Sequence, residues 1–151
     1  MSDPLYRKEL LRLAADAHGA GRLAQPKATG RAHNPTCGDK VTVYLVIELG
    51  RVSQIAQEAK ACVLTQASAS ILGQNLRGAT REDVEALHRR LSAMLEAVGP
   101  PPDAPFEAFG AFDAAIAYPG RHRCVLLPVD AVLAAFDASE ASEPKTMGPE
   151  R

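Results

Sequence analysis

A cysteine and a carboxylate two residues apart form the segment of this sequence best suited to chemistry. Residues 34–39 read Asn-Pro-Thr-Cys-Gly-Asp, which places Cys37 and Asp39 on either side of Gly38. Glycine lets the backbone bend closely around whatever the thiol and the carboxylate hold. The alternative interpretation is an ordinary turn between two strands, with Asp39 hydrogen-bonded to its own backbone. On its own, the segment therefore indicates either a binding site or a structural turn.

Two further cysteines stand where regular elements are expected to begin. Cys62 opens a helical stretch, and the free N–H groups at a helix start lower the pKa of a thiol. Cys124 follows Arg121 and Arg123, whose charges favour its thiolate form. Three thiolates and one carboxylate make up the four donors of a tetrahedral metal site. No two cysteines are paired as C-x-x-C, however, so buried packing residues are the alternative for all three.

The pattern of apolar residues predicts an α+β fold that would position these side chains. Residues 41–49 are dense in β-branched side chains, and Gly50 separates them from a second strand over 51–58, so the two are expected to pair as a hairpin. With a strand within 22–33, they form a small antiparallel three-stranded sheet covered on one face by helices. Apolar spacing and helix breakers predict helices over 4–17, 62–76, 80–98 and 128–136.

The 151 residues fit one domain over 1–138, with a disordered tail over 139–151. The proline-rich stretch 99–120 is expected to be an irregular insert within that domain. Closely spaced phenylalanines predict that this insert packs onto the body of the domain: Phe106, Phe109 and Phe112.

Composition and charge exclude several classes of function. The formal net charge is −1 and tryptophan is absent, which argues against a nucleic-acid partner. No apolar run approaches the ~20 residues of a membrane helix, and the N-terminus lacks the features of a secretion signal. A cytoplasmic protein with no membrane partner is therefore expected. Three well-separated cysteines, an odd number, argue against a disulfide framework.

Two linked motifs resemble the NifU-like family of iron–sulfur scaffold and sulfur-transfer proteins. That family carries N-P-x-C-G-D, matched here by residues 34–39, and then C-x-x-x-x-A-S-A-S, matched by residues 62–70. The stretches 5–7 and 18–23 are also similar to its N-terminal region, so the resemblance covers roughly residues 4–138. It implies the fold of that family, with the site at one end of the sheet.

Within the family, the sequence is more similar to the zinc-binding SufU branch than to the IscU scaffold branch. SufU proteins have a basic residue before the third cysteine, as Arg123 precedes Cys124 here, and an insert that the stretch 99–120 resembles. IscU proteins have a histidine at that place and an upstream L-P-P-V-K segment, where this chain reads Ala-Tyr-Pro-Gly-Arg over 117–121.

The resemblance to SufU implies zinc held by Cys37, Asp39, Cys62 and Cys124, and a cysteine desulfurase as partner. Cys37 would be the sulfur acceptor, the catalytic thiol of a sulfur carrier rather than of a stand-alone enzyme. It would pass sulfur to a downstream iron–sulfur scaffold or to an apo-protein acceptor. Asp39 is a harder ligand than a thiolate and is expected to weaken one corner of a soft site.

Two other functions stay open. In the first, the chain is the scaffold for a [2Fe–2S] cluster, with iron instead of zinc and the three cysteines as cluster ligands. In the second, it is a binding module whose zinc is purely structural. Arg123 and the insert favour the sulfur acceptor over the scaffold. Asp39 argues against the structural site, because such sites usually close with cysteine and histidine only.

The histidines are weaker candidates than the cysteines. His33 and His122 lie near ligands in the sequence and are candidates for hydrogen-bond donors to the ligands or for substitute ligands. Arg123 is expected to influence the site through its charge.

Overall fold

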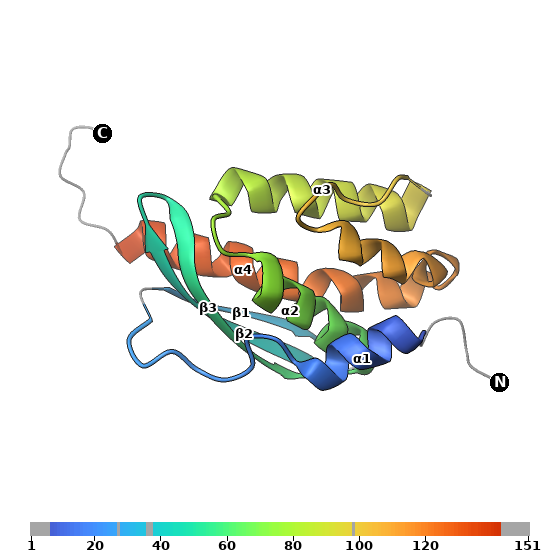
Figure 1. The fold of residues 1–151 in the computed structure, drawn as a ribbon, viewed down its shortest axis with the longest axis horizontal. Helices are drawn as coiled ribbons and strands as arrows, with labels where there is room; N and C mark the ends of the chain where they lie inside the picture. The colour runs from blue at the N-terminus through green and yellow to red at the C-terminus, as the bar shows by residue number, and fades with distance from the viewer. Residues whose placement is uncertain (1–6, 27, 36–37, 98, 143–151) are drawn as a thin grey trace.

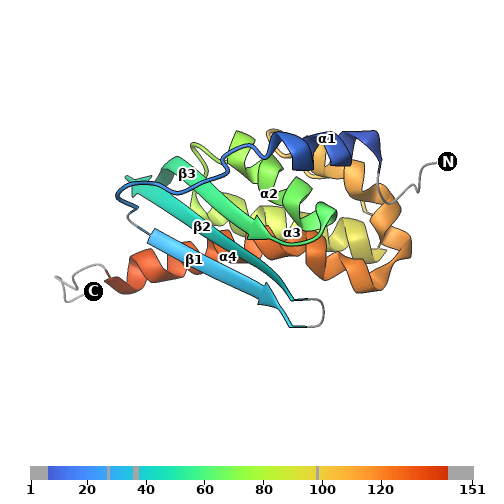
Figure 2. The ribbon, with the colours of Figure 1, turned by 90° about the horizontal axis from the view of Figure 1, so that it is seen from below.

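A three-stranded antiparallel sheet with helices on one face makes up the described part of the chain (Figure 1). The structure is a computed structural model that describes residues 7–26, 28–35, 38–97 and 99–142. In Figure 2 the sheet lies in front of α2, α3 and α4, which shows that its other face is left uncovered. The predicted α+β fold with one covered sheet face is confirmed. The strands, in the order β1-β2-β3, are β1 (Ala28–Asn34), β2 (Asp39–Glu48) and β3 (Arg51–Lys60). The α-helices are α1 (Lys8–Asp16), α2 (Val63–Asn75), α3 (Arg81–Ala97) and α4 (His122–Ser142). Two 3-10 helices, η2 (Glu107–Ala117) and η3 (Pro119–Arg121), lie between α3 and α4.

Central strand β2 shows why this sequence forms a one-sided sheet. Val41, Val43 and Leu45 are almost completely buried in the core, whereas the alternating Thr42 and Tyr44 are only partly covered. Side chains alternate between the two faces of a strand, so one apolar residue in two is enough to bury one face. The alternation therefore fixes which face of the sheet the helices cover.

A two-residue turn at Leu49 and Gly50 joins β2 to β3, as the predicted hairpin requires. Both residues have positive φ, 53° at Leu49 and 78° at Gly50. Turns of this kind match the right-handed twist of paired strands, and glycine enters them without strain. Leu49 is an unusual occupant, because it carries a Cβ and its side chain is fully exposed.

Two glycines allow backbone segments to approach each other without an intervening side chain. A Cβ on Gly30 of β1 would lie 2.1 Å from the carbonyl oxygen of Ala131 and 2.3 Å from the nitrogen of Ala135, both in α4. A Cβ on Gly73 of α2 would lie 2.0 Å from the carbonyl oxygen of His18, just after α1. Glycine is therefore what permits α4 to rest directly on β1.

The insert packs onto the body of the domain as predicted. Phe106, Phe109 and Phe112 are buried, and neighbouring rings of the three lie 6.4 Å and 5.9 Å apart, centroid to centroid. Much of the segment forms the 3-10 helix η2. The insert thus adds apolar contacts to the core cluster instead of forming a free linker.

Helix α4 extends beyond the predicted range 128–136 at both ends. Proline suits the first turn of a helix, which is why the sequence indicated a start at Pro128, but Pro128 lies inside the helix. Residues 139–142 are helical too, in contrast to the disordered tail expected from 139 onward. The rest of that tail lies outside the described residues.

Most other predicted boundaries agree with the structure within a few residues. The first strand, expected within 22–33, runs over Ala28–Asn34. Of the predicted helix over 4–17, residues 4–6 lie outside the described part of the chain. None of the helices in the described ranges is long and apolar enough to span a membrane.

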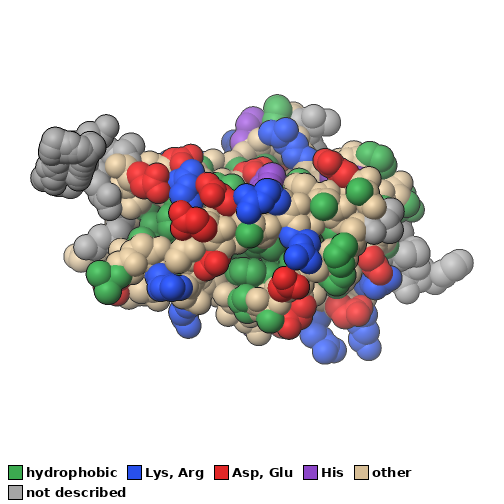
Figure 3. Space-filling view, turned by 90° about the horizontal axis from the view of Figure 1, so that it is seen from above, with side chains coloured by type: hydrophobic (Ala, Val, Ile, Leu, Met, Phe, Trp, Pro, Cys, Tyr) green, Lys and Arg blue, Asp and Glu red, His purple; other side chains and the backbone are tan. Residues whose placement is uncertain are grey.

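Charged side chains join the start of α3 to the end of α4. Arg81 forms ion pairs with Glu85 on its own helix and with Asp137 and Glu140 on α4. Figure 3 shows acidic and basic side chains interspersed over the visible face of the molecule. These pairs are largely exposed, so each contributes little to stability, but together they help to align α3 with α4.

Candidate metal centre

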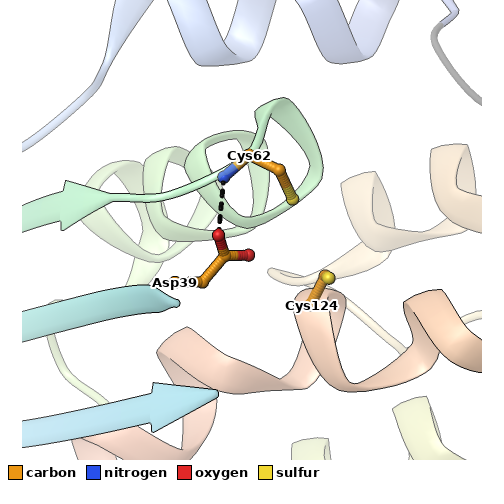
Figure 4. Close-up of side chains that lie close together, drawn as sticks. All are labelled: Asp39, Cys62 and Cys124. Carbon is orange, nitrogen blue, oxygen red and sulfur yellow. Dashed lines mark hydrogen bonds between the residues drawn. The ribbon is translucent and has the colours of Figure 1, made fainter. Parts of the chain in front are cut away.

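Three side chains from three different elements meet at one end of the sheet. Asp39 is the first residue of β2, Cys62 precedes α2 as its N-cap residue, and Cys124 lies in the first turn of α4. One carboxylate oxygen and the two sulfur atoms all lie within 4.8 Å of one another (Figure 4). The structure therefore brings together three of the four residues predicted as ligands. The fourth, Cys37, lies outside the described residues.

The Asp39 carboxylate is buried and held by hydrogen bonds on both oxygens. Its side chain is 6% exposed. The backbone N–H of Cys62 donates to Oδ1 at 3.2 Å (Figure 4), and the hydroxyl of Thr65 lies 3.2 Å from Oδ2. Asp39 thus interacts with the start of α2, not only with its own backbone as in an ordinary turn. A buried carboxylate needs such partners or a cation to offset its lost hydration.

Cys62 is half-buried, and its pKa is strongly lowered. A hydrogen bond with Cys124 is the largest cause and, with smaller contributions from the hydroxyl and backbone N–H of Thr65, lowers the pKa of the Cys62 thiol to about 6. Burial and the Asp39 carboxylate act in the opposite direction and raise this pKa. The thiolate is consequently the main form at neutral pH, as metal binding requires.

Two buried hydroxyls on α2 hold the first turns of α4. Thr65 donates to the carbonyl oxygen of Cys124 at 2.9 Å, and Ser68 donates to that of Val125 at 2.7 Å. Sequence analysis did not single out Thr65, although it lies between Cys62 and the A-S-A-S motif. The sequence does carry a signal for Thr65: its hydroxyl comes three residues after the candidate ligand Cys62 and therefore lies on the same side of the helix.

His33, His122 and Arg123 were weaker candidates from the sequence, and they do not belong to the group of three side chains at this centre. His33 is exposed on β1, opposite Lys40 of β2. Nε2 of His122 lies 3.0 Å from the carbonyl oxygen of Ala115, which can only accept, so this nitrogen carries the hydrogen and holds η2. Arg123 is exposed; burial raises the pKa of the nearby Asp130 carboxylate, and His88 and, to a smaller extent, Arg123 lower it. Among the described residues, the group able to hold a metal is Asp39, Cys62 and Cys124.

The chemistry of these donors fits a zinc ion or the iron of a cluster. Two sulfur donors and one carboxylate oxygen make a mostly soft set, which suits zinc and iron–sulfur chemistry rather than magnesium or calcium. Ligand atoms of a tetrahedral zinc site with Zn–S bonds of about 2.3 Å lie about 3.8 Å apart. Donors within 4.8 Å of one another need only small movements to reach that separation.

Comparison with known proteins assigns the family. The chain matches the NifU-like N-terminal domain over residues 5–125, a range that includes all four predicted ligands. The chain belongs to the NifU-like N-terminal domain family. A solved NifU-like protein (N-terminal) from Brucella abortus shares 36% sequence identity with a TM-score of 0.88, covering 93% of this chain and 98% of that one.

Other known proteins are similar over shorter stretches or in fold alone. The iron–sulfur cluster assembly scaffold protein IscU of Thermotoga maritima is 31% identical over 83 residues, 55% of this chain and 58% of that protein. IscU 1 of Archaeoglobus fulgidus is 26% identical over 95 residues, 63% of this chain and 61% of that protein. The matches thus span less than two thirds of these curated relatives. A putative scaffold protein for the SUF system from Fervidobacterium islandicum AW-1 shares the fold, with a TM-score of 0.80 at 20% identity, covering 89% of this chain and 98% of that one.

Proposed function

We propose that this protein works in iron–sulfur cluster assembly and accepts sulfur from a cysteine desulfurase at a zinc site. The ligands proposed are Cys37, Asp39, Cys62 and Cys124. The observation that carries the proposal is the convergence of a carboxylate oxygen and two sulfurs within 4.8 Å, next to the loop that contains Cys37. Membership of the NifU-like family supports it.

The described residues support the binding part of this proposal. The lowered pKa of Cys62, about 6, favours its thiolate at neutral pH, and donors lie beside both oxygens of Asp39, so little reorganisation would be needed for a cation to bind. Zinc would supply positive charge that keeps the thiols deprotonated, without redox chemistry of its own. The carboxylate is a harder donor than a thiolate, so its bond to zinc would be weaker than a zinc–thiolate bond.

Sulfur transfer is proposed to use the loop between β1 and β2. The Cys37 thiolate would attack the outer sulfur of a persulfide on the desulfurase. A new S–S bond forms at Cys37, the old S–S bond breaks, and the desulfurase cysteine leaves as a thiolate. Gly38, at φ 78°, adopts a backbone conformation that few other residues tolerate, just before Asp39 begins β2. Downstream acceptors would be an iron–sulfur scaffold or an apo-protein.

Assembly of a [2Fe–2S] cluster on the same thiols is the second candidate function. The names of the curated relatives from Thermotoga maritima and Archaeoglobus fulgidus favour it, since both are called scaffold proteins. In this chain, Arg123 before Cys124 and the insert over 99–120 favour the sulfur acceptor. The two functions predict different metals in the purified protein.

Metal content and persulfide mapping together test the proposal. Protein purified without added metal should contain about one zinc per chain, whereas brown protein with bound iron would favour the scaffold. After incubation with a cysteine desulfurase and cysteine, mass spectrometry should locate the persulfide on Cys37. Cys37→Ser should lose both this persulfide and any stimulation of desulfurase turnover, while still folding.

A control at the end of β1, just before this loop, makes the result specific. His33 is exposed at the end of β1 and does not belong to the ligand group, so His33→Ala should accept sulfur as the wild type does. Persulfide on Cys124, with Cys37→Ser fully active, would refute the assignment of the acceptor. Equal losses in His33→Ala and Cys37→Ser would show that the loop matters only for docking.

A further inference from the structure

We infer that Thr65 is a positioning residue of the metal centre, whose hydroxyl holds Asp39 and Cys62 in register with the backbone of Cys124. The inference rests on the metal site of the proposed function but adds a residue outside the predicted ligand set. Thr65 is fully buried. Its Oγ1 lies 2.9 Å from the carbonyl oxygen of Cys124, 3.2 Å from Oδ2 of Asp39 and 3.5 Å from Sγ of Cys62.

Thr65 contacts all three described ligands, although each comes from a different element. Asp39 belongs to β2, Cys62 precedes α2, and Cys124 belongs to α4. Strand β2 and helices α2 and α4 can each shift slightly against the others, which would spread the donor atoms. One buried hydroxyl in contact with all three ligands opposes that movement.

Pro128 explains why the Cys124 carbonyl is available to Thr65. In a regular helix, the N–H four residues later donates to this carbonyl, but Pro128 lies at that position and has no N–H. Thr65 donates to this carbonyl from α2, so the interior proline of α4 and the hydroxyl of α2 meet at the same backbone group of the site.

The Thr65 hydroxyl has fewer hydrogens than acceptors around it. A threonine hydroxyl has a single hydrogen and two lone pairs. The Cys124 carbonyl and Oδ2 of Asp39 are both acceptors of the Thr65 hydroxyl, so the two compete for that hydrogen.

Ser68 provides a matched control on the same helix. Its hydroxyl is also fully buried and donates to a carbonyl of α4, that of Val125, at 2.7 Å. The bond of Ser68 thus reaches α4 one residue beyond Cys124. If Thr65 only stabilises the contact between α2 and α4, Thr65→Val and Ser68→Ala should behave alike.

The test compares zinc affinity and the cobalt spectrum of three full-length variants. Zinc dissociation constants are measured by competition with a chromophoric chelator, and Co(II) absorption reports the ligand set and its geometry. Thr65→Val should bind zinc about 10- to 100-fold more weakly, the usual effect of losing a hydrogen bond to a ligand, and should change the cobalt bands. Thr65→Ser keeps the hydroxyl and should restore both. Ser68→Ala should lower the melting temperature but leave affinity and spectrum unchanged.

Several outcomes would overturn the inference. Thr65→Val with wild-type zinc affinity and cobalt bands would do so, as would equal changes in Thr65→Val and Ser68→Ala. If Thr65→Val does not fold, Thr65→Ala removes the same hydroxyl without placing a methyl group against the carboxylate, and the same comparison applies. Wild-type protein that binds neither zinc nor cobalt would instead refute the metal site itself, and with it both proposals.

Discussion

Alanine at Gly30 should destabilise the protein through backbone contacts between β1 and α4. The new Cβ would lie 2.1 Å and 2.3 Å from two backbone atoms of α4, where real Cβ contacts are hardly ever below 3.0 Å. Neither atom belongs to a flexible side chain, so the whole helix must move by about 1 Å, and overpacking of this kind costs about 1–3 kcal/mol or more. We expect a loss of about 3 kcal/mol, or a melting temperature lower by roughly 6–12 °C for a chain of this size.

Gly30→Ala should also affect the metal centre, because α4 carries Cys124. The assay combines urea denaturation with zinc titration of the folded variant. Gly120→Ala is the matched control, since a Cβ there meets nothing within 4 Å and the backbone φ is ordinary. A Gly30→Ala variant as stable as Gly120→Ala would refute the reasoning and show that α4 tolerates displacement from β1.

Two further predictions concern the Cys62 thiol and the β2–β3 turn. In metal-free protein, alkylation of Cys62 followed by mass spectrometry should be half-maximal near pH 6, because the lowered pKa makes the thiolate the main form above about that pH. Cys124→Ala removes the hydrogen bond that is the largest cause of the lowered pKa and should move this midpoint upward; a midpoint near the ordinary cysteine value in the wild type would contradict it. Leu49→Asn should raise the free energy of unfolding in urea by about 0.5–1 kcal/mol, because asparagine tolerates the positive φ at Leu49 and suits a turn with Gly50. Unchanged stability in that variant would mean that Leu49 is not strained.

The sequence by itself determined the class of fold and predicted the three candidate ligands that the structure brings together. Strand β2 and the hairpin that follows it were predictable, because alternation of apolar residues records directly which face of a strand is buried. Asp39, Cys62 and Cys124 were predictable as a set because their motifs resemble one family, not because their spacing requires a common site. The predicted role of Cys37 stays a prediction.

Only the tertiary structure decided how these residues are held. The true extent of α4 and the role of Pro128 were missed, because local rules place proline at a helix start, whereas here a hydroxyl on another helix replaces the lost backbone donor. The contact of α4 with Gly30 was also missed, because the residues next to this glycine in the sequence do not indicate which distant helix packs against it. Thr65 and the Cys124 carbonyl are 59 residues apart in the chain. Local periodicity reports burial within one element, but a hydrogen bond between two elements depends on how they pack, which no short stretch of sequence records.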